Sequence, residues 1–191
     1  PPRLFSPKAT GETFVDLYNY PTSIVLHGVA ARIEKDQALW VWYFKASDLF
    51  SGNKLEYYGG ELTYWIRWLT SGSSKFELKY IDANTKKDIY DVIIIGGQSG
   101  SPITLTYIYP NNSPKTEGDY EYQKIPLSNK GCKYGRDCWR LGAETNATEA
   151  QIQYAMENII SLYIRGKYSL RKGADNYGYL DEVRMSKPSV P

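Results

Sequence analysis

Apolar and polar residues alternate along most of the chain with a period of two, rather than the 3.6 of a helix. Such alternation is typical of strands that bury one face and expose the other. It is clearest in residues 61–69, where one face would carry Leu62, Tyr64, Ile66 and Trp68. The other segments that fit a strand are residues 13–18, 23–27, 38–45, 76–81, 90–95, 103–109, 120–127, 160–168 and 180–185.

Short stretches rich in Gly, Asn, Ser and Pro separate many of these segments, and these residue types are the usual ones in turns. They occur at residues 51–53, 71–74, 82–84, 96–100 and 110–114. Many strands therefore follow one another at short spacing, without alternating helices. This order predicts an all-β chain folded as a β-sandwich, rather than an α/β fold.

One segment, residues 149–158, breaks the alternation and predicts a helix of two to three turns. Thr148 and Gln151 fit a capping box, with Thr148 as the N-cap and Gln151 reaching back to it. Apolar residues then recur at helical spacing, at Ile152, Ala155, Met156 and Ile159. The segment 91–95 is apolar on both faces, so we expect it to lie buried under this helix; the alternative is an interface with another chain.

Length and charge limit the classes of protein that fit. A length of 191 residues fits one large domain or two small ones. No repeat, linker or low-complexity tract divides the chain, so we predict a single domain, 1–191, with a core of about 13–186. A net charge of +2 argues against a nucleic-acid binder. The sequence has no run of about 18 apolar residues, the length that a membrane-spanning helix needs. Aromatic residues make up 15% of the chain, including 18 tyrosines, which argues against disorder and favours strands.

Two cysteines and two sequons point to secretion. Cys132 and Cys138 are too far apart for a CxxC redox motif, and no Cys or His cluster completes a zinc site. We favour a local disulfide between them over free thiols. Asn146 and Asn111 begin N-glycosylation sequons. The chain begins without Met or a signal segment, as a mature or excised fragment would, and this start is compatible with a signal peptide that has been removed. From the cysteines and the sequons we expect the chain to be secreted, extracellular or on the cell surface.

Residues 39–69 carry an ordered set of motifs that resembles the laminin IV type A domain, also called the laminin B domain. The set comprises Trp42-Tyr43-Phe44-Lys45-Ala46, Leu49-Phe50-Ser51-Gly52-Asn53, Tyr58-Gly59-Gly60 and Leu62-Thr63-Tyr64. Later motifs agree in order and extend the resemblance over about residues 13–186. They are Tyr120-x-Tyr122, Ile125-Pro126-Leu127, Trp139, the helix at 145–156, Ile164-Arg165-Gly166-Lys167-Tyr168 and Leu180-Asp181-x-Val183.

The resemblance implies a jelly-roll β-sandwich similar to carbohydrate-binding modules. It also implies a non-catalytic adhesion or assembly module of extracellular matrix proteins such as laminins and perlecan, with an extracellular protein or glycan as the partner. The alternative function is that of a lectin-like carbohydrate-binding module.

An enzymatic reading has little support in the residues. Gly97-Gln98-Ser99-Gly100 faintly resembles the nucleophile loop of a serine protease, but His27 is the sole candidate base, so a hairpin turn is favoured. A glycosidase needs two carboxylates facing each other across a groove. The candidate acids form no compact cluster along one strand: Glu56, Glu61, Glu77, Glu121, Asp181 and Glu182. We therefore expect no catalytic residues.

No metal site or cofactor is located by the sequence. Asp82, Asn84 and Asp88 offer hard oxygen ligands, but Lys86 and Lys87 lie among them and no bidentate Glu closes the loop. A polar hairpin turn is therefore favoured there. Sugar-binding jelly rolls often hold a structural calcium, and no residue pattern places one in this chain.

Aromatic and basic residues give the candidate ligand-binding positions. Trp65 and Arg67 share the polar face of residues 61–69, and Tyr163 and Arg165 are predicted to face outward from residues 160–168. An aromatic ring stacks on the apolar side of a sugar, while Arg offers forked donors to hydroxyl or acidic groups. If the two strands shared a sheet, the four side chains would line one strip suited to an acidic or sulfated sugar. The alternative, favoured for each residue by itself, is cross-strand packing that stabilises a sheet.

Overall fold

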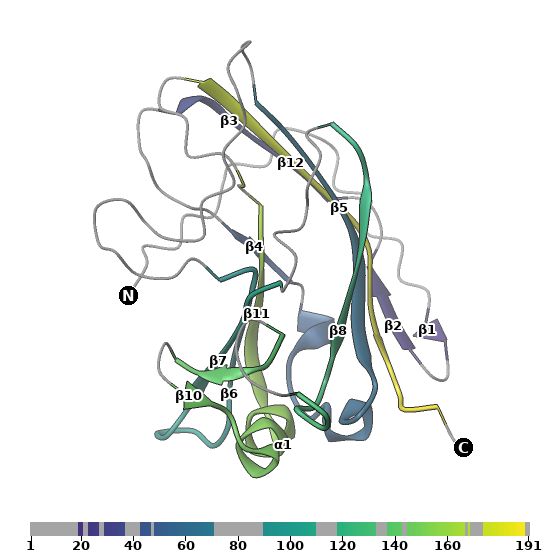
Figure 1. Ribbon diagram of the computed structural model, residues 1–191, viewed down its shortest axis with the longest axis vertical. Helices are drawn as coiled ribbons and strands as arrows, with labels where there is room; N and C mark the ends of the chain where they lie inside the picture. The colour runs from purple at the N-terminus through teal and green to yellow at the C-terminus, as the bar shows by residue number, and fades with distance from the viewer. Residues whose placement is uncertain are drawn as a thin grey trace.

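The computed structural model describes residues 19–20, 23–26, 29–36, 43–46, 48–70, 90–109, 118–132, 137–142, 145–166, 168 and 174–189. The described strands form two antiparallel sheets that face each other, with one α-helix at one end (Figure 1). This arrangement confirms the predicted β-sandwich.

The first sheet, called the β5 sheet here, has the strand order β1-β2-β12-β5-β8, and β3 also pairs with β12. Its strands are β1 (Asn19–Tyr20), β2 (Ser23–Leu26), β3 (Val29–Asp36), β5 (Glu61–Thr70), β8 (Glu121–Pro126) and β12 (Ala174–Ser186). β12 is long enough to pair with β3 over its first half and with β2 over its second half. Its other edge pairs with β5.

The second sheet, called the β6 sheet here, has the strand order β10-β9-β7-β6-β11-β4. Its strands are β4 (Tyr43–Lys45), β6 (Val92–Gly96), β7 (Ile103–Tyr107), β9 (Arg140–Leu141), β10 (Thr145–Asn146) and β11 (Ile159–Arg165). Two short 3-10 helices, η1 (Asp48–Phe50) and η2 (Leu55–Tyr57), lie in the connection from β4 to β5.

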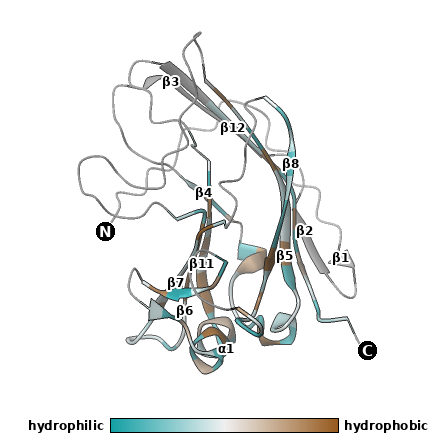
Figure 2. Cartoon of the chain, in the orientation of Figure 1, coloured by the Kyte–Doolittle hydropathy of each residue, from teal (hydrophilic) through white to brown (hydrophobic). Residues whose placement is uncertain are grey.

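The core fills the space between the sheets. On β5 the predicted inward face is entirely buried, at Leu62, Tyr64, Ile66 and Trp68. The β6 sheet contributes Val92, Ile94, Leu105, Leu162 and Ile164. Figure 2 shows β11 and parts of β5 in the apolar colour. Burial of these side chains is the main favourable contribution to folding, at about 1.5–3 kcal/mol for each large apolar residue.

The predicted helix is α1 (Glu149–Glu157), and its capping box is present. The backbone nitrogen of Gln151 donates to Thr148 Oγ1, and the backbone nitrogen of Thr148 donates to Gln151 Oε1. Ile152, Ala155 and Met156 are buried as predicted, while Ile159 already begins β11. The helix packs closely on the end of β6, because a Cβ atom added to Gly96 would lie 2.1 Å from the Ala155 carbonyl oxygen.

The cysteines form the predicted disulfide, and the bond lies beside a buried tryptophan. Cys132 and Cys138 are bonded, with 5.7 Å between their Cα atoms. Trp139 follows directly, is fully buried, and donates from Nε1 to the Pro126 carbonyl oxygen at 2.7 Å. The disulfide loop thus leads the chain into the core where β9 begins.

Several strand boundaries differ from the prediction. β3 was not predicted, and neither were the two-residue strands β1, β9 and β10. β12 begins at Ala174, six positions before the predicted start, and it pairs along its whole length with neighbours. The predicted segments 13–18 and 76–81 lie outside the described residues, as do residues 38–42 and the acidic turn with Asp82, Asn84 and Asp88.

Candidate functional site

The outer face of the β5 sheet displays Trp65 and Arg67 on its central part. The alternation that buries Tyr64 and Ile66 turns both of these residues away from the core, and Trp65 is 37% exposed. Trp65 lies opposite Tyr122 of β8 on one side and Asp181 of β12 on the other. The sequence prediction for this strand face is therefore confirmed as far as orientation goes.

Three tyrosines join this pair, two from the neighbouring strands and one, Tyr120, from the position directly before β8. The five residues are called the aromatic strip here. The strip consists of Trp65, Arg67, Tyr120, Tyr122 and Tyr179. The ring centroids of Trp65 and Tyr122 lie 5.1 Å apart with the rings tilted by 48°. Tyr120 and Tyr122 are 48% and 51% exposed, so the strip presents aromatic surface to solvent.

Arg67 is held between two of these tyrosines. Its Cζ atom lies 5.6 Å from the ring centroid of Tyr120 and 5.3 Å from that of Tyr179. Its Nε atom is buried and has no hydrogen-bond partner among the described residues. Contact with the two rings restricts the positions that the guanidinium group can take.

Charged groups of both signs surround the strip. Lys124 Nζ lies 2.7 Å from Glu61 Oε1, and this hydrogen bond raises the pKa of Lys124 above its ordinary value. Asp181 lies opposite Trp65 on β12. A ligand of the strip would therefore meet aromatic surface first and mixed charges at its margin.

A β-bulge interrupts β12 beside Trp65. The register with β5 shifts between Asp181 and Arg184, and Glu182 within the bulge has φ of 47°. The backbone nitrogen of Glu182 donates to Asp181 Oδ1 at 2.8 Å and supports this unusual conformation. A non-glycine residue in the left-handed region costs free energy, and such strain and bulges concentrate near functional sites.

The second predicted pair does not join the strip, because β11 belongs to the other sheet. Tyr163 is half-buried on β11, opposite Ile93 and Lys45. The prediction that Arg165 faces outward is wrong, since its side chain is entirely buried. Arg165 and Ile164 lie on opposite faces of β11, as the alternation predicts. The Arg165 position is nevertheless removed from solvent, and the Arg165 side chain contacts a charged partner there.

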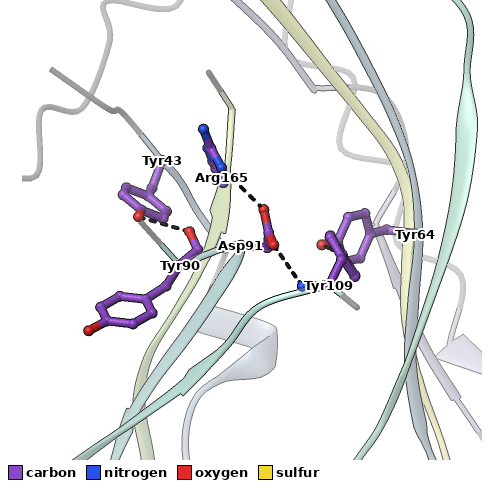
Figure 3. A network of polar contacts seen from close by, with 6 residues as sticks. All are labelled: Tyr43, Tyr64, Tyr90, Asp91, Tyr109 and Arg165. Carbon is purple, nitrogen blue, oxygen red and sulfur yellow. Dashed lines mark hydrogen bonds and ion pairs between the residues drawn. The ribbon is translucent and has the colours of Figure 1, made fainter. Parts of the chain in front are cut away.

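That partner is Asp91, and the two residues form a buried polar network (Figure 3). Arg165 Nη1 lies 3.5 Å from Asp91 Oδ1, and Asp91 Oδ2 accepts a hydrogen bond from the backbone nitrogen of Tyr109 at 2.8 Å. The hydroxyl of Tyr109 is hydrogen-bonded to that of Tyr64 on β5, so the network connects the two sheets. The Tyr43 hydroxyl donates to the Tyr90 carbonyl oxygen, and burial raises the pKa of Tyr43.

A comparison with known protein families shows the family of the chain. The family model Laminin B (Domain IV) matches residues 43–189. The chain belongs to the laminin domain IV family. The L4b domain of human laminin alpha-2 has a similar solved structure, with 18% sequence identity, a TM-score of 0.56, and coverage of 76% of this chain and 69% of that chain. At that identity the likeness shows a common fold. No curated protein sequence matches the chain.

The paired glycines Gly59 and Gly60 have a physical explanation in this laminin domain IV chain. Gly59 has φ of 81°, a conformation that favours glycine. A Cβ atom added to Gly60 would lie 1.9 Å from the Ser186 carbonyl oxygen, so any side chain there would collide with the backbone of β12. The Tyr58-Gly59-Gly60 motif thus allows β5 to begin directly against the end of β12.

Those of the other candidate positions that the structure describes form no second site in this laminin domain IV chain. Residues 98–101 form an exposed turn between β6 and β7, in which the Ser101 nitrogen donates to the Gln98 carbonyl oxygen. Within the described part of the chain, no group of three or more His, Cys, Asp and Glu side chains could hold a metal ion. None of the helices in the described residues has the length and apolarity that crossing a bilayer requires. Asn146 lies half-buried on β10, whereas Asn111 and His27 fall outside the described residues.

Sequence reasoning missed Tyr120, Tyr122 and Tyr179 as members of the strip, and it missed Asp91 as the partner of Arg165. A signal existed for the first two, because Tyr120 and Tyr122 alternate with Glu121 and Gln123 and share a face with Lys124. Tyr179 and Asp91 carried no such signal, since their neighbours come from strands far away in the sequence.

Proposed function

We propose that this chain is a non-catalytic extracellular adhesion module that binds a protein partner through the aromatic strip. The laminin domain IV family is an extracellular, structural module, and this membership gives the class of function. The aromatic strip is the proposed binding surface. Ligand binding by Trp65 and Arg67 thereby stays a prediction, now with Tyr120 and Tyr122 added to it.

One observation carries the proposal: exposed aromatic side chains gather on β5 and at the start of the neighbouring β8. The exposed large hydrophobic residues of the described chain are Leu49, Leu55, Trp65, Tyr120, Tyr122 and Ile160. All the aromatic members of this set belong to the strip, next to the guanidinium of Arg67. Trp, Tyr and Arg are the residue types that contribute most to binding energy at protein interfaces.

The second candidate is lectin-like binding of a glycan at Trp65. Its supporting observation is that Trp65 is 37% exposed and shares its strand face with Arg67. A sugar could stack on the indole ring while Arg67 donates to hydroxyl or acidic groups. The 48° tilt between Trp65 and Tyr122 favours one stacked sugar over a long flat chain, because the two rings do not form one plane.

The experiment measures binding of the chain to a panel of extracellular matrix proteins, to heparin and to neutral glycans. Trp65→Ala and Arg67→Ala are compared with the wild type. Ile160→Ala is the matched control, because Ile160 is an exposed large side chain on the other sheet. The protein-binding proposal expects at least one matrix protein to bind, with a loss of about 2 kcal/mol or more for Trp65→Ala and no loss for the control.

The outcomes separate the two candidates. If the glycan reading holds, Trp65→Ala lowers glycan affinity at every salt concentration, while Arg67→Ala lowers it mainly at low salt, because exposed charges are screened over about 8 Å at physiological ionic strength. Matrix-protein binding that ignores both variants would show that the partner uses another surface. Absence of binding to the whole panel by the wild type would remove both candidates for the tested ligands.

A further inference from the structure

Residues 119–122 read Asp-Tyr-Glu-Tyr, and Glu117 lies shortly before them. Tyr120 thus has a carboxylate on each side, and Tyr122 directly follows one. The sulfotransferases of the secretory pathway bind tyrosines flanked by acidic residues, because a basic substrate groove complements the charge of such a segment. A chain of an extracellular family passes through the compartment in which this modification takes place.

The structure places both tyrosines where an enzyme could reach them. Tyr120 is 48% exposed and Tyr122 is 51% exposed. Tyr120 lies between the turn at Gly118 and the start of β8, and Asp119 beside it is exposed. Among the described strands, β8 is an edge strand of the β5 sheet. It pairs with β5 on one side, and no described strand pairs with its other side.

We propose that Tyr120 is a site of tyrosine O-sulfation and that Tyr122 is a second acceptor. The proposal rests on the extracellular role given above and adds a modification of the same surface. The phenol oxygen attacks the sulfur atom of an activated phosphosulfate, which is a mixed anhydride of phosphate and sulfate. A new oxygen–sulfur bond to tyrosine forms, the sulfur–oxygen bond to phosphate breaks, the phosphate leaves, and the phenol proton passes to a base of the transferase. No oxidation or reduction takes place.

Sulfation would change the kind of partner that the aromatic strip binds. A sulfate ester keeps its negative charge at physiological pH, so each modified tyrosine adds one permanent charge to a surface that now has mixed charges. The ring of Tyr120 already lies 5.6 Å from the guanidinium carbon of Arg67, which counters part of this charge. The modified strip would favour a partner whose contact surface is rich in Lys and Arg.

The test incubates the purified chain with a tyrosylprotein sulfotransferase and a radiolabelled phosphosulfate donor. The wild type is expected to take up label, Tyr120→Phe to lose more than half of it, and Tyr120→Phe/Tyr122→Phe to fall to background. Asp119→Asn/Glu121→Gln keeps both acceptor hydroxyls and is also expected to lose most of the label. Tyr163→Phe is the matched control and keeps it, because Tyr163 has no acidic neighbour in the sequence.

An unlabelled wild type, or label that persists in the double Phe variant, would overturn the proposal. The Phe variants retain the rings, and circular dichroism of each variant confirms that a lost signal is not a lost fold. Labelling requires no binding partner, so its failure leaves the adhesion proposal standing. Conversely, a labelled chain that binds nothing on the matrix panel, before or after sulfation, would contradict the adhesion proposal and leave the modification site established.

Discussion

Arg165 of β11 and Asp91, which directly precedes β6, are joined both by their side chains and by their backbones. The guanidinium Nη1 lies 3.5 Å from the carboxylate Oδ1, and the backbone nitrogen of Arg165 donates to the Asp91 carbonyl oxygen at 2.8 Å. Both side chains are completely removed from solvent. The pair therefore lies in the interior of the sandwich and is no part of its surface.

Removing one partner of this pair is expected to destabilise the fold strongly. Arg165→Met leaves the carboxylate of Asp91 buried without its cation, which should cost about 3–5 kcal/mol. The double variant Arg165→Met/Asp91→Asn should lose less than the sum of the two single losses, because it leaves no unpaired charge. Urea unfolding of the three variants measures these free energies.

The partly exposed pair of Lys187 and Glu56 provides the control. Its Nζ and Oε2 atoms are 2.7 Å apart, closer than the atoms of the buried pair, yet the Lys187 side chain is 35% exposed and that of Glu56 is 56% exposed. Lys187→Met should therefore change the unfolding free energy little. A loss for Arg165→Met no larger than that for Lys187→Met would contradict the buried role of the pair.

The N-terminal cap and the buried face of α1 should differ in their contributions. Thr148→Ala removes the oxygen that accepts from Gln151 and should cost about 1 kcal/mol, whereas Thr148→Ser keeps the cap. Ile152→Ala should cost about 2–5 kcal/mol, because Ile152 is 1% exposed. Thermal or chemical unfolding measures all three variants. Equal, negligible losses would mean that the helix contributes nothing to the packed core.

The disulfide should survive isolation and contribute modestly to stability. The loop between Cys132 and Cys138 has a sequence separation of 6, and closing so short a loop stabilises the fold by about 2 kcal/mol through the entropy of the unfolded chain. Intact mass after alkylation without reductant is expected to show no modified thiol. Two alkylated cysteines in secreted material would contradict the bond.

Stability should fall at alkaline pH because of buried tyrosines. Burial raises the pKa of Tyr43 and of Tyr109, whereas in the unfolded chain a tyrosine loses its proton near about pH 10. A pKa raised in the folded state gives stability that is fully present below about pH 10 and is lost as the pH rises toward the folded value. The unfolding free energy should therefore decline above about pH 10.

A matched variant tests this cause. Tyr43→Phe leaves one fewer buried phenol to ionise, so its unfolding free energy should fall less steeply with pH than that of the wild type. Phenolate absorbance followed together with circular dichroism shows whether the buried groups ionise only as the fold is lost. An identical slope for wild type and variant would mean that Tyr43 is not responsible.

The sequence predicts well what depends on local alternation. Residues 61–69 have their inward and outward faces as expected, because one strand in a half-buried sheet repeats every second residue. Thr148 and Gln151 also form their capping box as expected, since both partners lie within one helical turn. The outward face of β5, with Trp65 and Arg67, follows from the same rule.

What the sequence could not predict depends on pairing between distant segments. Asp91 and Arg165 are 74 positions apart, so nothing in the residues around Arg165 indicates its buried partner. β3 carries small and charged residues at Ala30, Ala31 and Arg32, which weaken the alternation that marks a strand. Its place in the sheet comes from pairing with β12, a contact that local patterns do not encode.

The position of β12 has a consequence for how the molecule is made. β12 follows β1, β2, β3, β5 and β8 in chain order and yet lies in the interior of their sheet, between β5 on one side and β2 and β3 on the other. During synthesis these strands leave the ribosome before the strand that joins them. Pairings across such long sequence separations form slowly and leave strand edges exposed meanwhile. We expect ribosome-stalled chains that stop before Ala174 to be digested readily by protease. Chains extended far enough past Ser186 for the whole of β12 to have left the ribosome should resist it. A strand made after its neighbours thus sets the moment at which the nascent chain becomes protected.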